Sequence, residues 1–251
     1  MKIKAILTSA LGGQIKVDGK RIPIAFSDDN GFLTLLRSVW KAGSKVMFIS
    51  GSPDHYDRND EILNCLKESF RLSRLETSDF IMCDERNTEA AELIPEMDVI
   101  ILAGGHVPTQ NAFMKKLKLK EHLEAFNGLV LAWSAGSMNC AETVYAAPEL
   151  PEEALDPDYQ RWISGLGLTS INILPHFQAI KDDILDGMRL IEDITYPDSF
   201  RHEIIALNNG SYIVIDDTSE TLYGEAYSIK DGVQKQICEN GKSVCVSEIT
   251  H

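Results

Sequence analysis

Ser134 lies where a run of apolar residues gives way to very small ones. The stretch LVLAWSAGSMNC occupies residues 129–140, and its apolar part reads as a buried strand that ends at the serine. A turn that presents a nucleophile between a strand and a helix needs small neighbours two positions away, and here these are Ala132 and Gly136. The amide of Ala135 would then lie at a helix N-terminus, where it could stabilise an oxyanion. A turn without chemical function would fit the same composition.

A second loop of small residues, AGGHVPTQN, follows the apolar run at residues 99–103. Gly104 and Gly105 leave their backbone amides unobstructed, so Gly105 could supply the second amide of an oxyanion hole. His106 is a candidate substrate contact, although an exposed loop histidine explains it equally well.

A serine nucleophile needs a general base, and histidine is the usual one because its pKa lies near neutrality. His176 stands at the end of the apolar stretch ILPHF, after Ser134 in chain order. His106 follows another candidate strand. The residue types alone leave both histidines open as the base.

The elements that must position these residues alternate along the first half of the chain. Continuous apolar runs separated by segments with helical spacing predict a parallel sheet covered by helices on both faces, an α/β fold. Ligands bind at the carboxyl ends of strands in such sheets, which is where Ser134 and Gly105 fall. The predicted strands are residues 3–7, 45–50, 80–83, 99–103 and 129–133, and the predicted helices are residues 31–42, 60–75, 88–93 and 111–126.

The second half has a different pattern. Residues 147–159 are rich in proline and acid and read as a surface loop, and residues 180–194 have helical spacing. From residue 203 onward the pattern is of strands, which predicts a β-rich C-terminal part that extends the same sheet or forms an adjoining one. With no internal repeat or long linker, we expect a single domain over residues 1–251.

Composition narrows the classes of function. The chain of 251 residues is 44% hydrophobic and 25% charged, with a formal net charge of −14. This excess of acid argues against nucleic acid or a membrane surface as the partner. No apolar run resembles a signal or a membrane span, so cytoplasm is the expected location. The five cysteines lack CxxC spacing, which favours reduced thiols over disulfides or a zinc site.

Three stretches taken together carry a family resemblance. VIILAGGH, LVLAWSAGS and GLGLTSINILPHF, in this order, resemble peptidase family S51, which holds dipeptidase E and cyanophycinase. The likeness extends from Met1 to about Asp217. It implies a fold similar to class I glutamine amidotransferases, Ser134 as nucleophile, His176 as base, and the amides of Gly105 and Ala135 as oxyanion hole. It implies no metal and no cofactor.

The position of the third catalytic residue departs from that family. Members usually carry an acid in a turn after a late strand, but the matching stretch IIALNNGSYIVID places Asn209 there. Asparagine can orient a histidine but brings no charge. Either Asn209 acts as a weaker orienter, or an acid such as Glu203 or Asp193 takes the role, or the chain binds without turning over. We favour the first, because the serine, the histidine and the glycine loop are intact.

The expected function is a cytosolic serine peptidase that cleaves short peptides through an acyl-enzyme, like dipeptidase E. A regulatory or binding protein on the same fold, or hydrolysis of another acyl bond, stays open.

Substrate specificity is poorly determined by the sequence. Dipeptidase E-like enzymes need a cation to bind the side chain of an N-terminal aspartate. Arg161, Arg189 and Arg201 lie in the second half of the chain, but nothing in the sequence assigns one of them to the pocket. Glu149 could bind a substrate amino group or simply belong to the acidic rim. We expect a homodimer.

Overall fold

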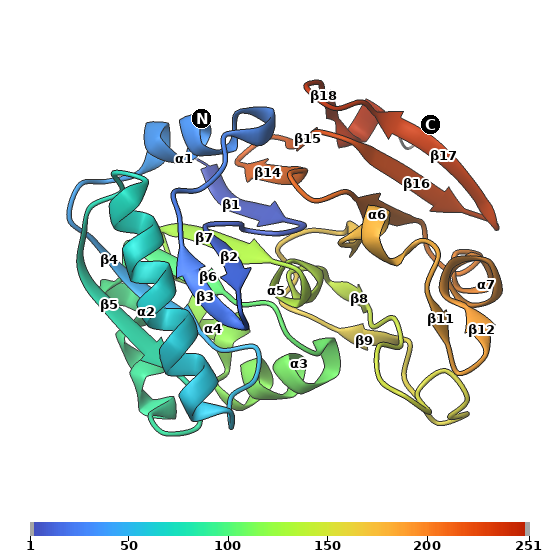
Figure 1. The fold of residues 1–251 in the computed structure, drawn as a ribbon, viewed down its shortest axis with the longest axis horizontal. Helices are drawn as coiled ribbons and strands as arrows, with labels where there is room; N and C mark the ends of the chain where they lie inside the picture. Colours follow the sequence, from blue (N-terminus) through green and yellow to red (C-terminus); the bar gives the residue numbers. More distant parts are fainter. Residues whose placement is uncertain (1–2, 249–251) are drawn as a thin grey trace.

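A twisted eight-stranded sheet forms the centre of the computed structural model, which describes residues 3–248 (Figure 1). Its strand order is β18-β15-β14-β1-β7-β6-β4-β5, and every pairing from β1 through to β5 is parallel. The expected α/β fold with a mostly parallel sheet is therefore confirmed. The parallel strands are β1 (Ile3–Thr8), β4 (Ser44–Ile49), β5 (Thr77–Cys83), β6 (Val99–Leu102) and β7 (Leu129–Trp133).

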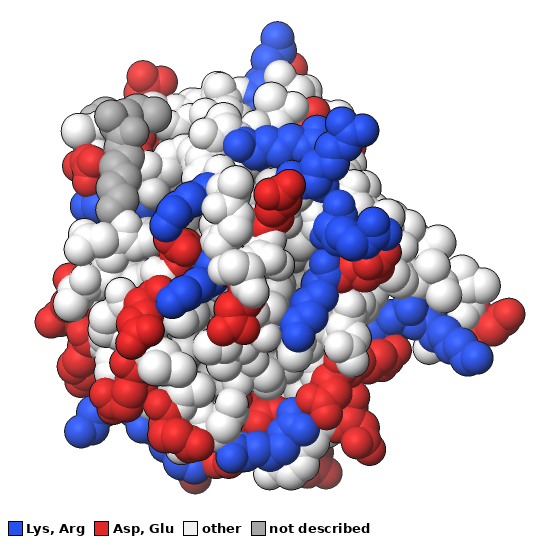
Figure 2. Space-filling view, turned by 90° about the vertical axis from the view of Figure 1, so that its left-hand side faces the viewer, with Lys and Arg blue, Asp and Glu red and all other residues white. Residues whose placement is uncertain are grey.

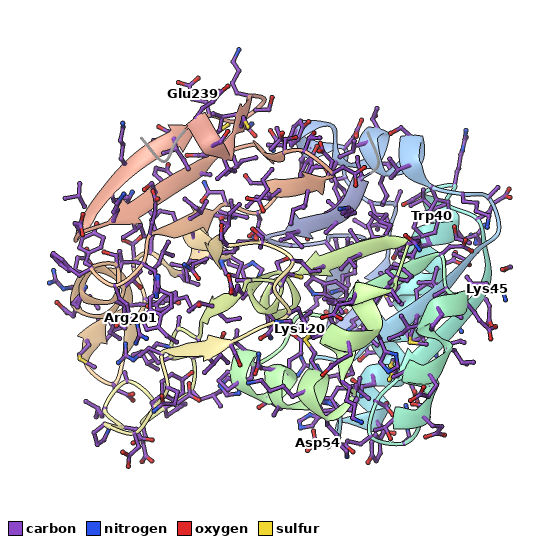
Figure 3. The ribbon with its side chains drawn as sticks, turned by 180° about the vertical axis from the view of Figure 1, so that it is seen from behind. Trp40, Lys45, Asp54, Lys120, Arg201 and Glu239 are labelled. Atoms are coloured by element: carbon purple, nitrogen blue, oxygen red, sulfur yellow. The ribbon has the colours of Figure 1, made fainter. Side chains whose placement is uncertain are left out.

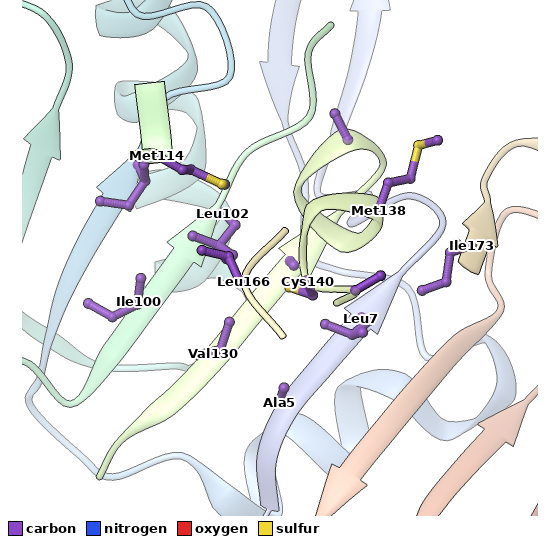
Figure 4. Close-up of a cluster of buried hydrophobic side chains, with 14 of the residues drawn as sticks. Ala5, Leu7, Ile100, Leu102, Met114, Val130, Met138, Cys140, Leu166 and Ile173 are labelled. Carbon is purple, nitrogen blue, oxygen red and sulfur yellow. The ribbon is translucent and has the colours of Figure 1, made fainter. Parts of the chain in front are cut away.

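Both faces of this sheet are buried, which explains why its strands read as continuous apolar runs. Successive side chains alternate between two cores: Leu7 and Val130 belong to one cluster, whereas Ile6 and Leu131 belong to the other. Figure 4 shows part of the first cluster, in which Leu7 and Val130 lie with Met138. The sheet is thus held from both sides, and its carboxyl edge has a fixed position.

Helices cover the two faces as predicted. One face carries α1 and α2, whose apolar residues join the second cluster, and the other carries η2, α3, α4 and α5. The predicted helix over residues 111–126 is in fact two, because Lys118 adopts φ 50° between them. The bounds are α1 (Phe32–Val39), α2 (Tyr56–Leu72), η2 (Thr88–Glu96), α3 (Val107–Lys116), α4 (Leu119–Glu124) and α5 (Ala135–Asn139).

The C-terminal part both extends the sheet and builds an adjoining one, so the two alternatives are realised together. Strands β14, β15 and β18 add to β1 in antiparallel fashion. A second sheet has the order β10-β13-β16-β17. The bounds are β14 (Tyr212–Asp216), β15 (Glu220–Tyr223), β18 (Ser243–Cys245), β10 (Asn172–Leu174), β13 (Ile204–Leu207), β16 (Ala226–Lys230) and β17 (Val233–Cys238).

The helix predicted over residues 180–194 is wrong. Asp186 and Gly187 both have positive φ and form a tight turn, which closes a hairpin and overrides the helical spacing. A second Asp-Gly turn, at Asp18 and Gly19, closes another unpredicted hairpin. The elements are α6 (Phe177–Ile180), β11 (Ile184–Leu185), β12 (Met188–Arg189), the π-helix η3 (Leu190–Thr195), α7 (Tyr196–Asp198), β2 (Gln14–Val17) and β3 (Lys20–Pro23).

Smaller elements complete the chain, and they too were absent from the sequence-based pattern. Strands β8 and β9 pair in antiparallel fashion after α5, on either side of the acidic loop. Their bounds are β8 (Thr143–Tyr145) and β9 (Trp162–Ser164), and the short 3₁₀ helices are η1 (Asp29–Gly31) and η4 (Val246–Glu248).

The surface charge is not evenly mixed. On the face shown in Figure 2, acidic side chains gather toward the left and lower edges and basic ones toward the upper right. Seen from behind, Trp40 and Arg201 lie at opposite ends of the molecule (Figure 3). All five cysteines are free thiols. Within residues 3–248, every helix is too short or too polar to cross a membrane.

Candidate active site

Ser134 sits in the turn between β7 and α5 in a backbone conformation that L-residues rarely adopt, with φ 52° and ψ −123°. Neighbouring strand β1 holds this turn. The carbonyl of Thr8 accepts a hydrogen bond from the Ser134 amide at 3.1 Å and another from the Ser137 hydroxyl at 2.8 Å. Strain at the serine is thus compensated by two bonds to the same oxygen, at the carboxyl edge of the sheet.

The small residues around Ser134 are required by close approach. A Cβ on Gly136 would overlap the carbonyl oxygen of Leu102 at the end of β6 and lie 2.8 Å from that of Ala103. Ala132, two positions before the serine, is completely buried. Glycine at position 136 therefore lets α5 begin directly against the neighbouring strand.

The Gly104-Gly105 loop lies against the serine turn. A Cβ on Gly104 would come within 3.1 Å of the Ser134 Cβ, and one on Gly105 would overlap the carbonyl oxygen of Gly51. Neither the Gly105 amide nor the Ala135 amide has a hydrogen-bond acceptor in the described part of the chain. Both amides are therefore free to donate a hydrogen bond to an oxyanion. Gly51, which follows β4, was not singled out from the sequence, where only its position after a strand could have indicated it.

His176 follows β10 and caps α6 with a left-handed backbone, φ 59° and ψ 25°. Its ring nitrogen Nδ1 lies 2.7 Å from Oδ1 of Asn209. His176 and Ser134 border the same two cavities. Among the described residues no hydrogen bond joins the two side chains, a contact that often tightens only when substrate binds.

Ser9, the residue after β1, joins His176 to Asn209. Its buried hydroxyl accepts the His176 amide at 2.8 Å and lies 3.2 Å from both Oδ1 of Asn209 and the carbonyl of Leu207. The backbone N–H of Asn209 donates a hydrogen bond to Oε1 of Gln178 at 2.9 Å. These contacts fix Asn209 from two sides. Ser9 and Gln178 were missed by sequence reasoning, which has no local signal for them.

The alternative acids are occupied elsewhere. Glu203 accepts a hydrogen bond from Ser228, and Asp193 forms a two-pronged ion pair with Arg189, with N–O distances of 2.7 and 3.0 Å. Neither contacts His176. Asn208, beside Asn209, has a buried Oδ1 without a hydrogen-bond partner among residues 3–248. The residue that meets the imidazole is therefore a neutral amide.

Two cavities border both the serine and the histidine. One, of about 460 Å³, is lined by three basic side chains and no acidic one, and we call it the cationic cavity. The other, of about 370 Å³, is mainly apolar with two carboxylates, and we call it the acidic cavity. The cations are Lys16, Arg21 and Arg58, and the carboxylates are Glu149 and Asp183.

Glu149 is held in an environment that disfavours its charge. Burial among protein atoms, and secondarily the nearby carboxylate of Glu153, raise its pKa from 4.5 to about 7. The side chain is nevertheless exposed to solvent in the wall of an open cavity, so water screens part of this effect. The structure thus puts Glu149 beside Ser134 rather than on a distant rim.

Other candidates named from the sequence lie outside these cavities. Nδ1 of His106 is 2.8 Å from the Thr109 hydroxyl, and its Nε2 is 2.8 Å from Glu153, at ion-pair distance but without hydrogen-bond geometry. His106 therefore ties the glycine loop to the acidic loop and lines neither cavity. Arg161 is paired with Asp198 at 2.9 Å, and Arg189 and Arg201 also line neither cavity.

Within the described residues 3–248, no group of three His, Cys, Asp or Glu side chains converges closely enough to hold an ion. The residues that border Ser134 offer a hydroxyl, an imidazole and backbone amides.

A serine at the carboxyl edge of a parallel sheet, with a histidine that borders the same two cavities, indicates a serine hydrolase. The sequence signature of Peptidase family S51 matches residues 27–223, and the chain belongs to this family of serine peptidases. No curated protein sequence matches the chain.

Solved structures show the same fold at low sequence identity. A peptidase from an acI-B1 Actinobacterium matches with a TM-score of 0.64 and 16% identity, covering 97% of each chain. A provisionally named peptidase E protein from Listeria monocytogenes EGD-e matches with a TM-score of 0.56 and 15% identity, covering 94% of this chain and 100% of the other.

Proposed function

We propose that this serine peptidase hydrolyses short peptides through an acyl-enzyme, with Ser134 as nucleophile and His176 as base. One observation carries the proposal: a serine in a strained strand-to-helix turn borders the same two cavities as a histidine whose Nδ1 is already bound to Asn209. The turn has the features of a nucleophile elbow, in which backbone strain holds the hydroxyl out toward the substrate.

Asn209 determines which nitrogen of the His176 ring acts as the general base. Because an amide oxygen only accepts, Oδ1 of Asn209 binds the protonated Nδ1 of His176. Nε2 is then unprotonated and can take the proton of the Ser134 hydroxyl as its oxygen attacks the scissile carbonyl. In this way a neutral residue supplies the tautomer that catalysis needs.

The remaining steps use the backbone. The amides of Gly105 and Ala135 would face the oxyanion that forms on the carbonyl oxygen. As the tetrahedral intermediate collapses, His176 gives its proton to the departing amine. Water, deprotonated by His176, then attacks the ester on Ser134, releases the acid and restores the hydroxyl.

A fluorophosphonate probe, which reacts with activated serines, tests this proposal. We expect the wild-type protein to be labelled and the folded Ser134→Ala variant not to be. Ser38, exposed on α1, provides the matched control, since Ser38→Ala should keep full labelling. Equal labelling of Ser134→Ala, or no labelling and no peptide cleavage by the folded wild type, would overturn the proposal.

The neutral Asn209 favours a second candidate function, a binding protein that hardly turns over. An Asp-to-Asn change costs about 10⁴ in rate in a well-known serine protease triad. Binding of a dipeptide by calorimetry without labelling or cleavage would support this candidate. Cleavage of simple esters rather than peptides would point to hydrolysis of another acyl bond.

The setting in which the peptidase works also remains a proposal. We propose one domain over residues 1–251, a cytoplasmic location, a homodimer, and a short peptide as the partner, with no nucleic acid, membrane or cofactor involved. The net charge of −14 supports the absence of polyanionic partners.

A further inference from the structure

Charges of opposite sign line the two cavities that Ser134 borders. The cationic cavity is formed by Lys16 and Arg21 of the hairpin β2–β3 and by Arg58 of α2. The acidic cavity is formed by the loop that carries Glu149 and by the segment after α6, which carries Asp183. In Figure 1 the hairpin and α2 lie to the left of α5, whereas β11 and β12 lie to its right.

Most of these charges have no ion-pair partner among residues 3–248. Among the described residues, the carboxylates of Glu149 and Asp183 form no ion pair, and neither do Lys16 and Arg58. Of these five groups, Arg21 alone forms an ion pair with another described residue, with its Nε 3.6 Å from Glu61. Charged groups that line a cavity without partners are complementary to a ligand that carries the opposite charges.

A dipeptide carries those charges in the required order. Its ammonium group lies on the N-terminal side of the scissile carbonyl, and its carboxylate lies on the C-terminal side. We propose, on the basis of the peptidase function above, that the acidic cavity binds the N-terminal residue with its free ammonium group and the cationic cavity binds the C-terminal carboxylate. The chain then acts on dipeptides, and charge sets the direction in which they bind.

The walls of the acidic cavity decide which N-terminal residue fits. Its other lining residues are apolar apart from Ser134 and His176, so a side chain such as that of leucine would be buried against hydrocarbon. An aspartate side chain would bring a third carboxylate next to Glu149 and Asp183, and like charges in a partly buried site repel. The cavity therefore selects apolar N-terminal residues and rejects aspartate. The apolar lining includes Met138, Leu174, Ile180 and Leu190.

The titration of Glu149 supports this direction of binding. An ammonium group beside the carboxylate would offset the burial that raises its pKa to about 7. Since only the ionised carboxylate attracts the ammonium group, the KM for a dipeptide should fall as the pH rises through about 7.

Hydrolysis of four matched substrates tests the proposal: Leu-Leu, Asp-Leu, N-acetyl-Leu-Leu and Leu-Leu-amide. We expect kcat/KM for Leu-Leu to exceed that for each of the others by about 10-fold or more, the size expected when a charge contact is lost or a repulsion is gained. Equal or faster cleavage of Asp-Leu, or indifference to acetylation, would overturn the inference.

Variants assign the effect to the two cavities. Glu149→Gln should raise the KM for Leu-Leu and lower the ratio of kcat/KM for Leu-Leu to kcat/KM for N-acetyl-Leu-Leu. Glu152→Gln, on the same loop but outside the cavity, should change neither the KM nor the ratio. Arg58→Gln should lower the ratio of kcat/KM for Leu-Leu to kcat/KM for Leu-Leu-amide. The control is Arg201→Gln, at an exposed position outside both cavities, which should leave this ratio unchanged. Unchanged ratios in Glu149→Gln and Arg58→Gln would contradict the assignment.

Failure of the proposed function can be told apart from failure of this inference. If fluorophosphonate labels Ser134 but Asp-Leu is preferred, the peptidase proposal stands and the charge assignment falls. If no substrate is cleaved, calorimetric titration of the folded Ser134→Ala variant with the same four peptides still ranks their binding. Tighter binding of Leu-Leu than of the other three supports the inference, and equal or reversed ranking overturns it.

Discussion

Nδ1 of His176 lies 2.7 Å from Oδ1 of Asn209, at the position where the S51 resemblance predicts an acid. An amide oxygen can hold the imidazole in one tautomer, but it cannot balance the positive charge that the ring gains during catalysis. The proposed triad therefore has one neutral member, Asn209, and the activity that such a site supports can be tested directly.

Replacement of Asn209 by aspartate should increase activity. The Asn209→Asp variant keeps an oxygen against Nδ1 and adds the missing charge, so kcat for a peptide or ester substrate should rise, by up to about 10³-fold. Asn240→Asp adds the same charge in an exposed turn and should leave kcat unchanged. A folded Asn209→Asp variant with wild-type or lower kcat would show that Asn209 does not act as the orienting residue.

Ser9 should act as a positioning residue. Ser9→Ala leaves the His176 amide without its acceptor and releases Oδ1 of Asn209, so kcat should fall by about 10-fold or more while KM changes little. A double-mutant cycle with Asn209→Ala should show strong coupling between the two positions. Additive effects, or a change confined to KM, would indicate that Ser9 only supports the fold.

Gly136 should be intolerant of a side chain. The Cβ of alanine would overlap the carbonyl oxygen of Leu102, and backbone atoms cannot give way as a flexible side chain can. We expect Gly136→Ala to lower the free energy of unfolding by about 1–3 kcal/mol, measured by urea denaturation. Ser38→Ala, on the surface of α1, serves as the reference. Stability within 0.5 kcal/mol of the wild type, roughly the range of neutral surface changes, would refute the close approach.

Glu149 should make the protein less stable as the pH rises. Its pKa is 4.5 in an unfolded chain and about 7 in the folded one, so the native state binds more protons between these values. The free energy of unfolding contributed by this group is therefore highest below pH 4.5 and falls as the pH rises toward 7.

The Glu149→Gln variant removes this dependence. Relative to the wild type, it should be more stable at about pH 8 than at about pH 5, by about 1 kcal/mol once screening by water in the open cavity is taken into account. Thermal melts of both proteins at the two pH values measure the difference, and Glu152→Gln controls for the loss of a surface charge. An identical offset at the two pH values would contradict the raised pKa of Glu149.

Some strands and the serine turn could be predicted from the sequence because each has a local physical requirement. Strands buried on both faces must be apolar throughout, so β4, β6 and β7 are visible as runs, and the turn at Ser134 must have small neighbours, so the serine motif is visible too. Where a local signal was ignored the prediction failed. The Asp186-Gly187 turn outweighed the helical spacing of residues 180–194.

Relationships between distant residues were decided only by the tertiary structure. Ser9, which follows β1 of the large sheet, meets His176, which follows β10 of the second sheet, across 167 positions in the chain. Arg58 of α2 likewise joins the cavity that Ser134 borders. Spacing along the chain does not indicate such contacts, since they depend on how the two sheets and the helices pack together. The sequence alone thus determined the fold class and the serine motif, whereas the packing of the sheet decided which side chains surround that serine and where their charges lie.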